Sequence, residues 1–113
     1  MQFILILVLI FTSLTNYAQQ GPLARNKFKI TGKVIEKISK QPLEYATATF
    51  TNTKYPKAIA GGVTNPKGEF DVEIVPGTYD IKIEFISFKT IIIKDRKFTE
   101  GSSLEEIALE EDA

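Results

Sequence analysis

The sequence predicts an all-β sandwich built around one hydrophobic core, and three observations support this fold class. Apolar and polar residues alternate with a period of two through most of the chain after residue 27, which is typical of half-buried strands. Turn signals containing proline or glycine separate these segments about every 8 to 12 residues. No amphipathic helix is found beyond an apolar N-terminal segment. The length of 113 residues fits a single domain.

Residues 1–18 have the layout of a secretory signal peptide, which is expected to form a helix ahead of the domain. An unbroken apolar run, Phe3–Phe11, is followed by small and polar residues, and cleavage is expected after Ala18. The run is shorter than the roughly 20 apolar residues of a membrane span, although an uncleaved anchor helix is the alternative. Residues 19–27 are polar and contain Gly-Pro, so they are expected to be a linker to a domain at 28–111.

The first half of the domain contains three predicted strands. Apolar residues and glycine alternate with lysine and threonine from Phe28 to Val34, and a turn-forming segment at 37–42 follows. In Tyr45–Asn52, alanine and phenylalanine occupy one face and threonines the other, which suits an exposed sheet face. The third segment, Ala58–Thr64, is weaker because Gly61-Gly62 interrupts it, and this glycine pair indicates a bulge or a close backbone approach.

The second half begins with the clearest turn and strands. In Asn65–Gly68, proline presets φ at the second position and the glycine can adopt the left-handed conformation that closes the turn. Phe70–Ile74 and Tyr79–Phe85 then alternate strictly between apolar and charged residues, with a type II turn predicted at Pro76-Gly77 between them. Two further strands are predicted at Phe88–Lys94 and about Leu104–Leu109.

The charges of these two regular strands predict that the chain changes sheets at the turn between them. In a tight hairpin, Glu73 would face Asp80 and Glu69 would face Glu84, and like charges directly opposite each other are destabilising. A type II turn also matches the twist of a hairpin poorly. We therefore expect the two strands to lie in different sheets with their apolar faces meeting across the core, and a hairpin with a longer loop is the alternative.

The composition excludes several classes of function. Lysine plus arginine and aspartate plus glutamate both number 14, so net charge gives no case for binding nucleic acid or an anionic membrane. Five acidic residues lie in 105–112, which is expected to be a solvated strand edge. The chain has no cysteine or histidine, so it has no disulfide, no thiolate or imidazole ligand for zinc, and no histidine base for a nucleophile. We predict that it is not an enzyme.

No catalytic, cofactor-binding or metal-binding residue is assigned, and no cofactor is expected. The outward carboxylates of Asp71, Glu73, Asp80 and Glu84 are the candidates for a calcium site or an acid–base pair. Strand alternation alone places them outside the core, however, and nothing in the sequence predicts that two of them converge. They are interpreted as parts of solvated sheet faces.

Three aromatic residues are poorly explained by the core. Tyr45, Tyr55 and Phe88 are candidates for stacking on a sugar or a partner protein, although ordinary surface packing explains them as well. The threonines of Thr47–Thr51 could meet a partner strand, but β-propensity also accounts for them. Gly61-Gly62 opens no helix and is not a phosphate-binding loop.

The order of the motifs resembles the carboxypeptidase regulatory-like domain, a transthyretin-like (prealbumin-like) sandwich, over about Phe28–Glu111. The resemblance implies a seven-stranded Greek-key sandwich without an active site. The motifs that carry it are Ile30–Val34, Gln41–Leu43, Ala46-Thr47, Thr64–Phe70, Pro76–Tyr79, Phe85–Thr90 and Ile107–Leu109.

The amino-acid sequence at Glu44–Ala46 and Tyr79–Phe88 is most similar to that of the domains that follow the signal peptide of TonB-dependent outer-membrane receptors. This resemblance implies a non-catalytic accessory domain on the periplasmic side of the outer membrane, with protein partners such as a receptor's plug and barrel. The segments of such a plug and barrel are not present in the 113 residues, so a leading piece of a receptor and a stand-alone relative both stay open. A carbohydrate-binding-like module of a secreted protein is the alternative function.

Overall fold

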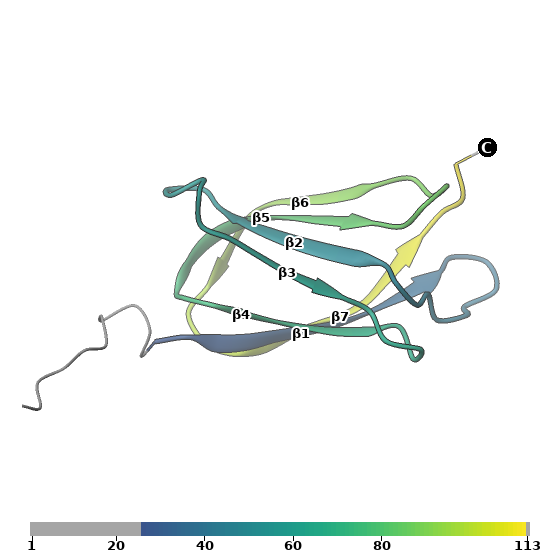
Figure 1. The fold of residues 1–113 in the computed structure, drawn as a ribbon, viewed down its shortest axis with the longest axis horizontal. Coiled ribbons are helices and arrows are strands. Elements are labelled where there is room, and N and C mark those ends of the chain that lie inside the picture. Colours follow the sequence, from purple (N-terminus) through teal and green to yellow (C-terminus); the bar gives the residue numbers. More distant parts are fainter. Residues whose placement is uncertain (1–25, 113) are drawn as a thin grey trace, which may run out of the picture.

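The computed structural model describes residues 26–112 and shows two β-sheets packed face to face (Figure 1). One sheet has the strand order β4-β1-β7 and the other has the order β3-β2-β5-β6. The strands are β1 (Phe28–Glu36), β2 (Thr47–Asn52), β3 (Ile59–Val63), β4 (Glu69–Ile74), β5 (Gly77–Glu84), β6 (Ile91–Phe98) and β7 (Ser102–Leu109). The predicted seven-stranded sandwich is confirmed. The predicted signal peptide, and the linker up to residue 25, lie outside the described residues. Among residues 26–112, no helix is long and apolar enough to cross a membrane.

The core consists of the alternate apolar residues of both sheets. On β4 the phenylalanine, valine and isoleucine are buried and the three intervening acidic residues are exposed, as the sequence predicts. Phe50, Tyr79 and Phe98 pack with ring centroids 6.0–6.3 Å apart at the end of the core where β5 begins. The Tyr79 hydroxyl donates a hydrogen bond to the Val75 carbonyl at 2.8 Å, so the buried ring keeps its polar group satisfied.

The chain changes sheets between β4 and β5, which confirms the prediction from the charge pattern. β4 pairs with β1 and places Glu73 opposite Lys29, whereas β5 pairs with β2 and places Asp80 opposite Thr51. Glu69 likewise lies opposite Lys33 instead of Glu84. In these two ladders each acidic residue therefore faces a basic or neutral partner, which removes the like-charge contacts of a hairpin.

The type II turn predicted at Pro76-Gly77 is wrong. Such a turn needs a φ of about +80° at its glycine, whereas Gly77 has a nearly extended φ of 159° and pairs with Phe98 as the first residue of β5. A glycine is needed here for space, because a Cβ atom would lie 2.9 Å from the Asn52 side-chain nitrogen. The chain thus passes directly from one sheet to the other across a bend at Pro76.

The other two glycine predictions are settled by the geometry. Gly68 has a φ of +76° and its amide donates to the Asn65 carbonyl at 2.8 Å, so the predicted turn is confirmed. At Gly61-Gly62 no bulge occurs, because β3 pairs with β2 without a register shift. A Cβ atom on Gly62 would lie 2.8 Å from the Asp71 carbonyl oxygen, so the pair marks a close approach of β3 to β4.

β6 and β7 differ from the predicted strands because each contains a bulge. β6 runs to Phe98 instead of ending at Lys94, and its register shifts by one residue at Asp95, which has a φ of 53°. The extra residue reverses the alternation, so that Ile93 and Phe98 both face the core. β7 shifts in the same way at Glu105, and it begins at Ser102, ahead of the predicted start.

β6 also begins later than predicted, at Ile91. The Phe88 amide donates to the Phe85 carbonyl at 3.0 Å, and Ser87 has a φ of 67°, so a turn occupies the predicted start of the strand.

Candidate functional site

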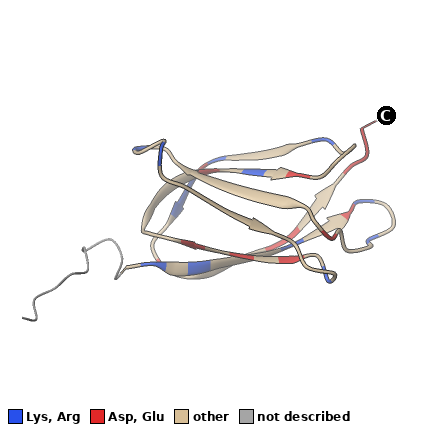
Figure 2. Ribbon diagram, viewed as in Figure 1, with Lys and Arg blue, Asp and Glu red and all other residues tan. Residues whose placement is uncertain are grey.

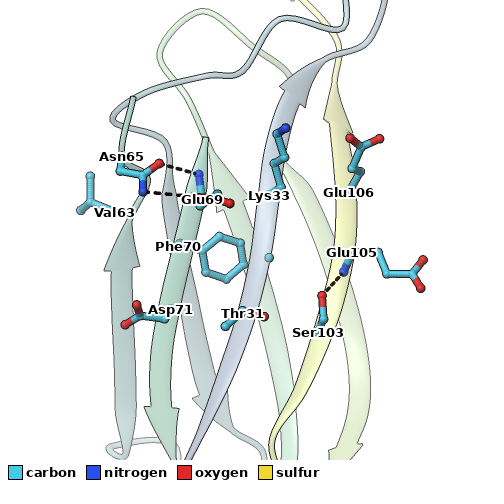
Figure 3. Close-up of a pocket in the computed structure, with 11 residues that line it drawn as sticks. Thr31, Lys33, Val63, Asn65, Glu69, Phe70, Asp71, Ser103, Glu105 and Glu106 are labelled. Atoms are coloured by element: carbon cyan, nitrogen blue, oxygen red, sulfur yellow. Dashed lines mark hydrogen bonds between the residues drawn. The ribbon is translucent and has the colours of Figure 1, made fainter. Parts of the chain in front are cut away.

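An open groove of about 670 Å³ lies at the three-stranded sheet (Figure 3). It extends across β4, β1 and β7, and the end of β3 and the following turn form one rim. It is lined by Thr31, Gly32, Lys33, Val63, Asn65, Glu69, Phe70, Asp71, Ser103, Glu105 and Glu106. The parallel pairing of β1 with β7 brings residues from the two ends of the domain together here.

The charge of the groove is predominantly acidic. Four residues with carboxylates, Glu69, Asp71, Glu105 and Glu106, line the groove together with one lysine, Lys33. Lys33 is opposite Glu69 on one neighbouring strand and opposite Glu106 on the other. The three ion pairs found within 4.0 Å among the described residues all lie elsewhere, so none neutralises these carboxylates at close range. The groove therefore favours cationic groups on a partner.

A tight turn fixes the rim on the β4 side. The Asn65 side-chain oxygen accepts hydrogen bonds from the Lys67 amide at 2.9 Å and from the Glu69 amide at 3.0 Å. The Asn65 amide in turn donates to the Glu69 carbonyl at 2.9 Å. Glu69 is thereby held at the start of β4, and the side-chain nitrogen of Asn65 lies 3.5 Å from the Glu69 carboxylate.

A glycine allows the middle of this sheet to pack. The Phe70 ring lies over Gly32, where a Cβ atom would come within 2.5 Å of two ring carbons. The two residues are direct partners in the β1–β4 ladder. Any side chain at position 32 would therefore require the Phe70 ring to shift.

The bulge in β7 supplies the acidic rim on the opposite side. Glu105 adopts a φ of 64°, and its amide donates to the Ser103 hydroxyl at 3.0 Å (Figure 3). Because the extra residue interrupts the alternation, Glu105 and Glu106 are both exposed although they are consecutive. Apart from the acidic composition of 105–112, no pattern in the sequence indicates this groove.

The four carboxylates singled out in the sequence do not form one site. Asp71 and Glu73 lie on β4, and Asp80 and Glu84 lie on β5, which belongs to the other sheet (Figure 2). Among residues 26–112 no group of three or more acidic side chains is placed to hold a metal ion.

The three unexplained aromatic residues are also separated. Tyr45 and Tyr55 are exposed at opposite ends of β2, so they form no common platform. Tyr45 and Phe88 instead border a shallow depression of about 380 Å³ together with Phe85 and Ile86. The Phe85 and Phe88 rings pack edge to face at 5.2 Å, and Ile86 is 83 % exposed.

The chain's last described residues run beside this depression. The Lys89 amide donates to the Glu110 carbonyl at 2.8 Å, and the Asp112 amide donates to the Ser87 carbonyl at 3.0 Å. Tyr45 and Ser87 have φ values of 67°, a conformation that is unfavourable for residues with a side chain. Two large apolar side chains, Tyr45 and Ile86, are thus exposed to solvent near the point where the described chain ends, among polar neighbours such as Thr47 and Glu84.

One carboxylate, that of Glu36, has a shifted pKa, and it lies outside both the acidic groove and the depression beside Tyr45. The amides of Ile38 and Ser39 donate to the Glu36 carboxylate, and these hydrogen bonds lower the pKa of Glu36 below its ordinary value of 4.5. The group fixes the turn after β1, and it belongs to no cluster that would use the shift chemically.

Comparison with known proteins identifies solved structures with a similar fold and a family whose model matches this chain. A chain of a type II cohesin–X-dockerin complex from Acetivibrio cellulolyticus is similar over 73 % of this chain and 56 % of its own, with 20 % identity and a TM-score of 0.54. A 9R-lipoxygenase from Cyanothece PCC8801 is similar over 83 % of this chain and 18 % of its own, with 17 % identity and a TM-score of 0.56.

The Bacillus anthracis TIE protein is similar over 75 % of this chain and 17 % of its own, with 16 % identity and a TM-score of 0.54. This chain thus spans about half of the first structure and less than a fifth of the other two, and these likenesses concern the sandwich alone. No curated protein matches the sequence. The family model of the CarboxypepD_reg-like domain matches residues 30–113, from the first core residue of β1 onward. The chain belongs to the CarboxypepD_reg-like domain family.

Proposed function

We propose that this chain is a non-catalytic accessory domain that binds other proteins on the periplasmic side of the outer membrane. We further propose that it is the N-terminal part of a TonB-dependent receptor for nutrient uptake. Family membership and the absence of histidine and cysteine from the sequence support a non-enzymatic role. The signal-like residues 1–18 support export.

The exposure of two large side chains, Tyr45 and Ile86, is the observation that carries this proposal. Tyr45 is 72 % and Ile86 is 83 % exposed, and the described chain ends at their side, where Asp112 is hydrogen-bonded to Ser87. A receptor segment that follows the domain would leave it next to this surface. Contact with the receptor's plug would then bury the apolar side chains that are exposed to solvent in the isolated domain.

The reading frame and the cellular fraction test the proposal together. We expect the gene to continue in frame beyond the Ala113 codon into a plug and barrel. We also expect an antibody against the domain to detect a protein much larger than 113 residues in the outer-membrane fraction. A stop codon directly after Ala113, with a small protein in the soluble secreted fraction, would contradict it.

A carbohydrate-binding-like module of a stand-alone secreted protein is the second candidate. It is favoured by the depression between Tyr45 and Phe88, because aromatic side chains are the usual platform for sugar rings. Titration of ¹⁵N-labelled domain with a panel of oligosaccharides tests it. Saturable shifts at Tyr45 and Phe88 would support sugar binding, and an unchanged spectrum with every oligosaccharide would exclude it for that panel.

A further inference from the structure

The free side of β3 has unpaired backbone groups. The Thr64 amide donates to the Ala46 carbonyl at 2.9 Å, and the Asn52 amide donates to the Ala58 carbonyl at 3.1 Å, so the even-numbered residues of this segment bond to β2. Antiparallel ladders alternate between bonded and non-bonded pairs. The amides and carbonyls of Ile59, Gly61 and Val63 therefore point away from β2, on a side where the described residues supply no paired strand.

The other three sheet edges have features that discourage an additional strand. β6 and β7 are bulged at Asp95 and Glu105, and bulges disrupt the pairing of a further strand. β4 has an acidic residue at every second position. β3 has neither a bulge nor a charged residue, and such an uncharged, regular edge favours strand addition.

Most of the side chains around this edge are apolar. Ile59 and Val63 are 61 % and 58 % exposed on the outer face of the four-stranded sheet. A mainly apolar hollow of about 250 Å³ lies beside β3; its lining includes Ala60 and Ile74 together with two charged residues, Lys27 and Glu73. An added strand would thus cover apolar surface in addition to forming backbone hydrogen bonds.

The charges of β4 indicate what kind of strand fits. β4 approaches β3 closely, since a Cβ atom on Gly62 would lie 2.8 Å from the Asp71 carbonyl oxygen. Glu69 and Glu73 each face a lysine on β1, but neither they nor Asp71 form an ion pair within 4.0 Å in the part of the chain that the structure describes. A second copy of the domain, paired through β3, would bring its own acidic β4 to the same edge. Like charges disfavour that dimer, and basic side chains suit the edge.

We propose that the β3 edge binds, by strand addition, an extended segment of a partner protein in which apolar and basic residues alternate. Its backbone pairs with the free groups of Ile59, Gly61 and Val63. Its apolar side chains lie beside Ile59 and Val63, and its basic side chains face the carboxylates of Asp71 and Glu73. This interaction is independent of whether the domain precedes a receptor.

A capped heptapeptide of alternating valine and lysine is the probe for this proposal, and the matched control alternates valine and glutamate. We expect saturable ¹⁵N–¹H shifts and slower hydrogen exchange at the amides of Ile59, Gly61 and Val63 with the lysine peptide only. Binding should weaken with added salt, which screens the carboxylates. Absence of these shifts, or equal binding of the glutamate peptide, would overturn the proposal.

Two pairs of variants locate the interaction. Gly61→Pro removes an amide that does not bond to β2 and should weaken binding at least about tenfold, whereas Gly61→Ala should stay within about twofold. Val63→Lys should weaken binding similarly. Ile92→Lys is its control, because Ile92 is 56 % exposed on the opposite edge of the same sheet. Circular dichroism checks that each variant is folded. If Gly61→Pro is unfolded, the comparison of Val63→Lys with Ile92→Lys tests whether the peptide binds at β3.

Analytical ultracentrifugation of the unlabelled domain tests whether a second copy of the domain occupies the β3 edge. We expect a monomer with all four variants and with the wild-type protein. A wild-type dimer that Val63→Lys dissociates and Ile92→Lys does not would show that a second copy occupies the edge, and this result would also overturn the proposal.

Discussion

Substitution of Gly32 by alanine tests the packing that shapes the three-stranded sheet. The added methyl group would lie 2.5 Å from two carbons of the Phe70 ring, well below contact distance. Phe70 is only 4 % exposed, so its ring cannot move outward without losing burial. Overpacking of this kind costs about 1–3 kcal/mol. We expect Gly32→Ala to lower the free energy of unfolding by that amount, measured by urea denaturation.

Gly61→Ala provides the matched control. It is also a glycine in a strand, but its added methyl group would meet only the Ala48 carbonyl at an ordinary 3.5 Å. This change should be neutral or stabilising by up to about 1 kcal/mol, because alanine restricts the unfolded chain.

A double-mutant cycle with Phe70→Leu then isolates the contact. If the ring causes the cost, Gly32→Ala should be at least about 1 kcal/mol less destabilising when leucine replaces Phe70. Equal costs at Gly32 in both backgrounds, or equal effects at Gly32 and Gly61, would refute the reasoning.

Three further predictions concern the core, a buried hydroxyl and pH. Phe98→Ala should cost about 3–5 kcal/mol in chemical denaturation, as expected for a buried aromatic, and a loss under about 1 kcal/mol would show that the β6 bulge does not turn Phe98 inward. Thr64→Val removes a hydroxyl that bonds to a backbone carbonyl at 2.6 Å and a backbone amide at 2.8 Å; we expect a loss of about 1–3 kcal/mol, and unchanged thermal stability would contradict it. The lowered pKa of Glu36 means that its contribution to stability is present above its ordinary pKa of 4.5 and is lost as the pH falls through the lower, folded-state pKa. Glu36→Gln should therefore lose less stability than the wild type on acidification, and identical pH profiles would rule out this role.

Local patterns in the sequence predicted most of the strands because burial follows alternation directly. The exposed glutamates and aspartate of β4 and the buried isoleucines of β5 are where a period of two places them. The assignment of β4 and β5 to different sheets was also predictable, because the repulsion of Glu73 and Asp80 penalises the local alternative. These conclusions need only residues that are close in sequence.

The bulges and the groove could not be predicted in this way. The three consecutive isoleucines of β6 do not show which face is buried, and the bulge at Asp95 then reverses the alternation, so the inward position of Phe98 does not follow from the local pattern. The groove depends on the pairing of β1 with β7, which places Glu106 next to Lys33. Alternation gives the face on which a side chain lies but not the neighbouring strand. The same limit explains the wrong turn at Gly77, whose partner Phe98 is distant in sequence.

Bulges and charge are distributed unequally between the two sides of the sandwich, and this asymmetry bears on where partners bind. On the side of β6 and β7, bulges at Asp95 and Glu105, whose backbones adopt the left-handed conformation, interrupt both edge strands. On the other side, the uncharged edge of β3 lies against β4, whose carboxylates also line the acidic groove. A partner at β3 would meet Asp71 from the edge, and a partner in the groove would meet it from the sheet face. Because one carboxylate serves both surfaces, a basic strand bound at β3 should weaken the attraction of the groove for a second cation.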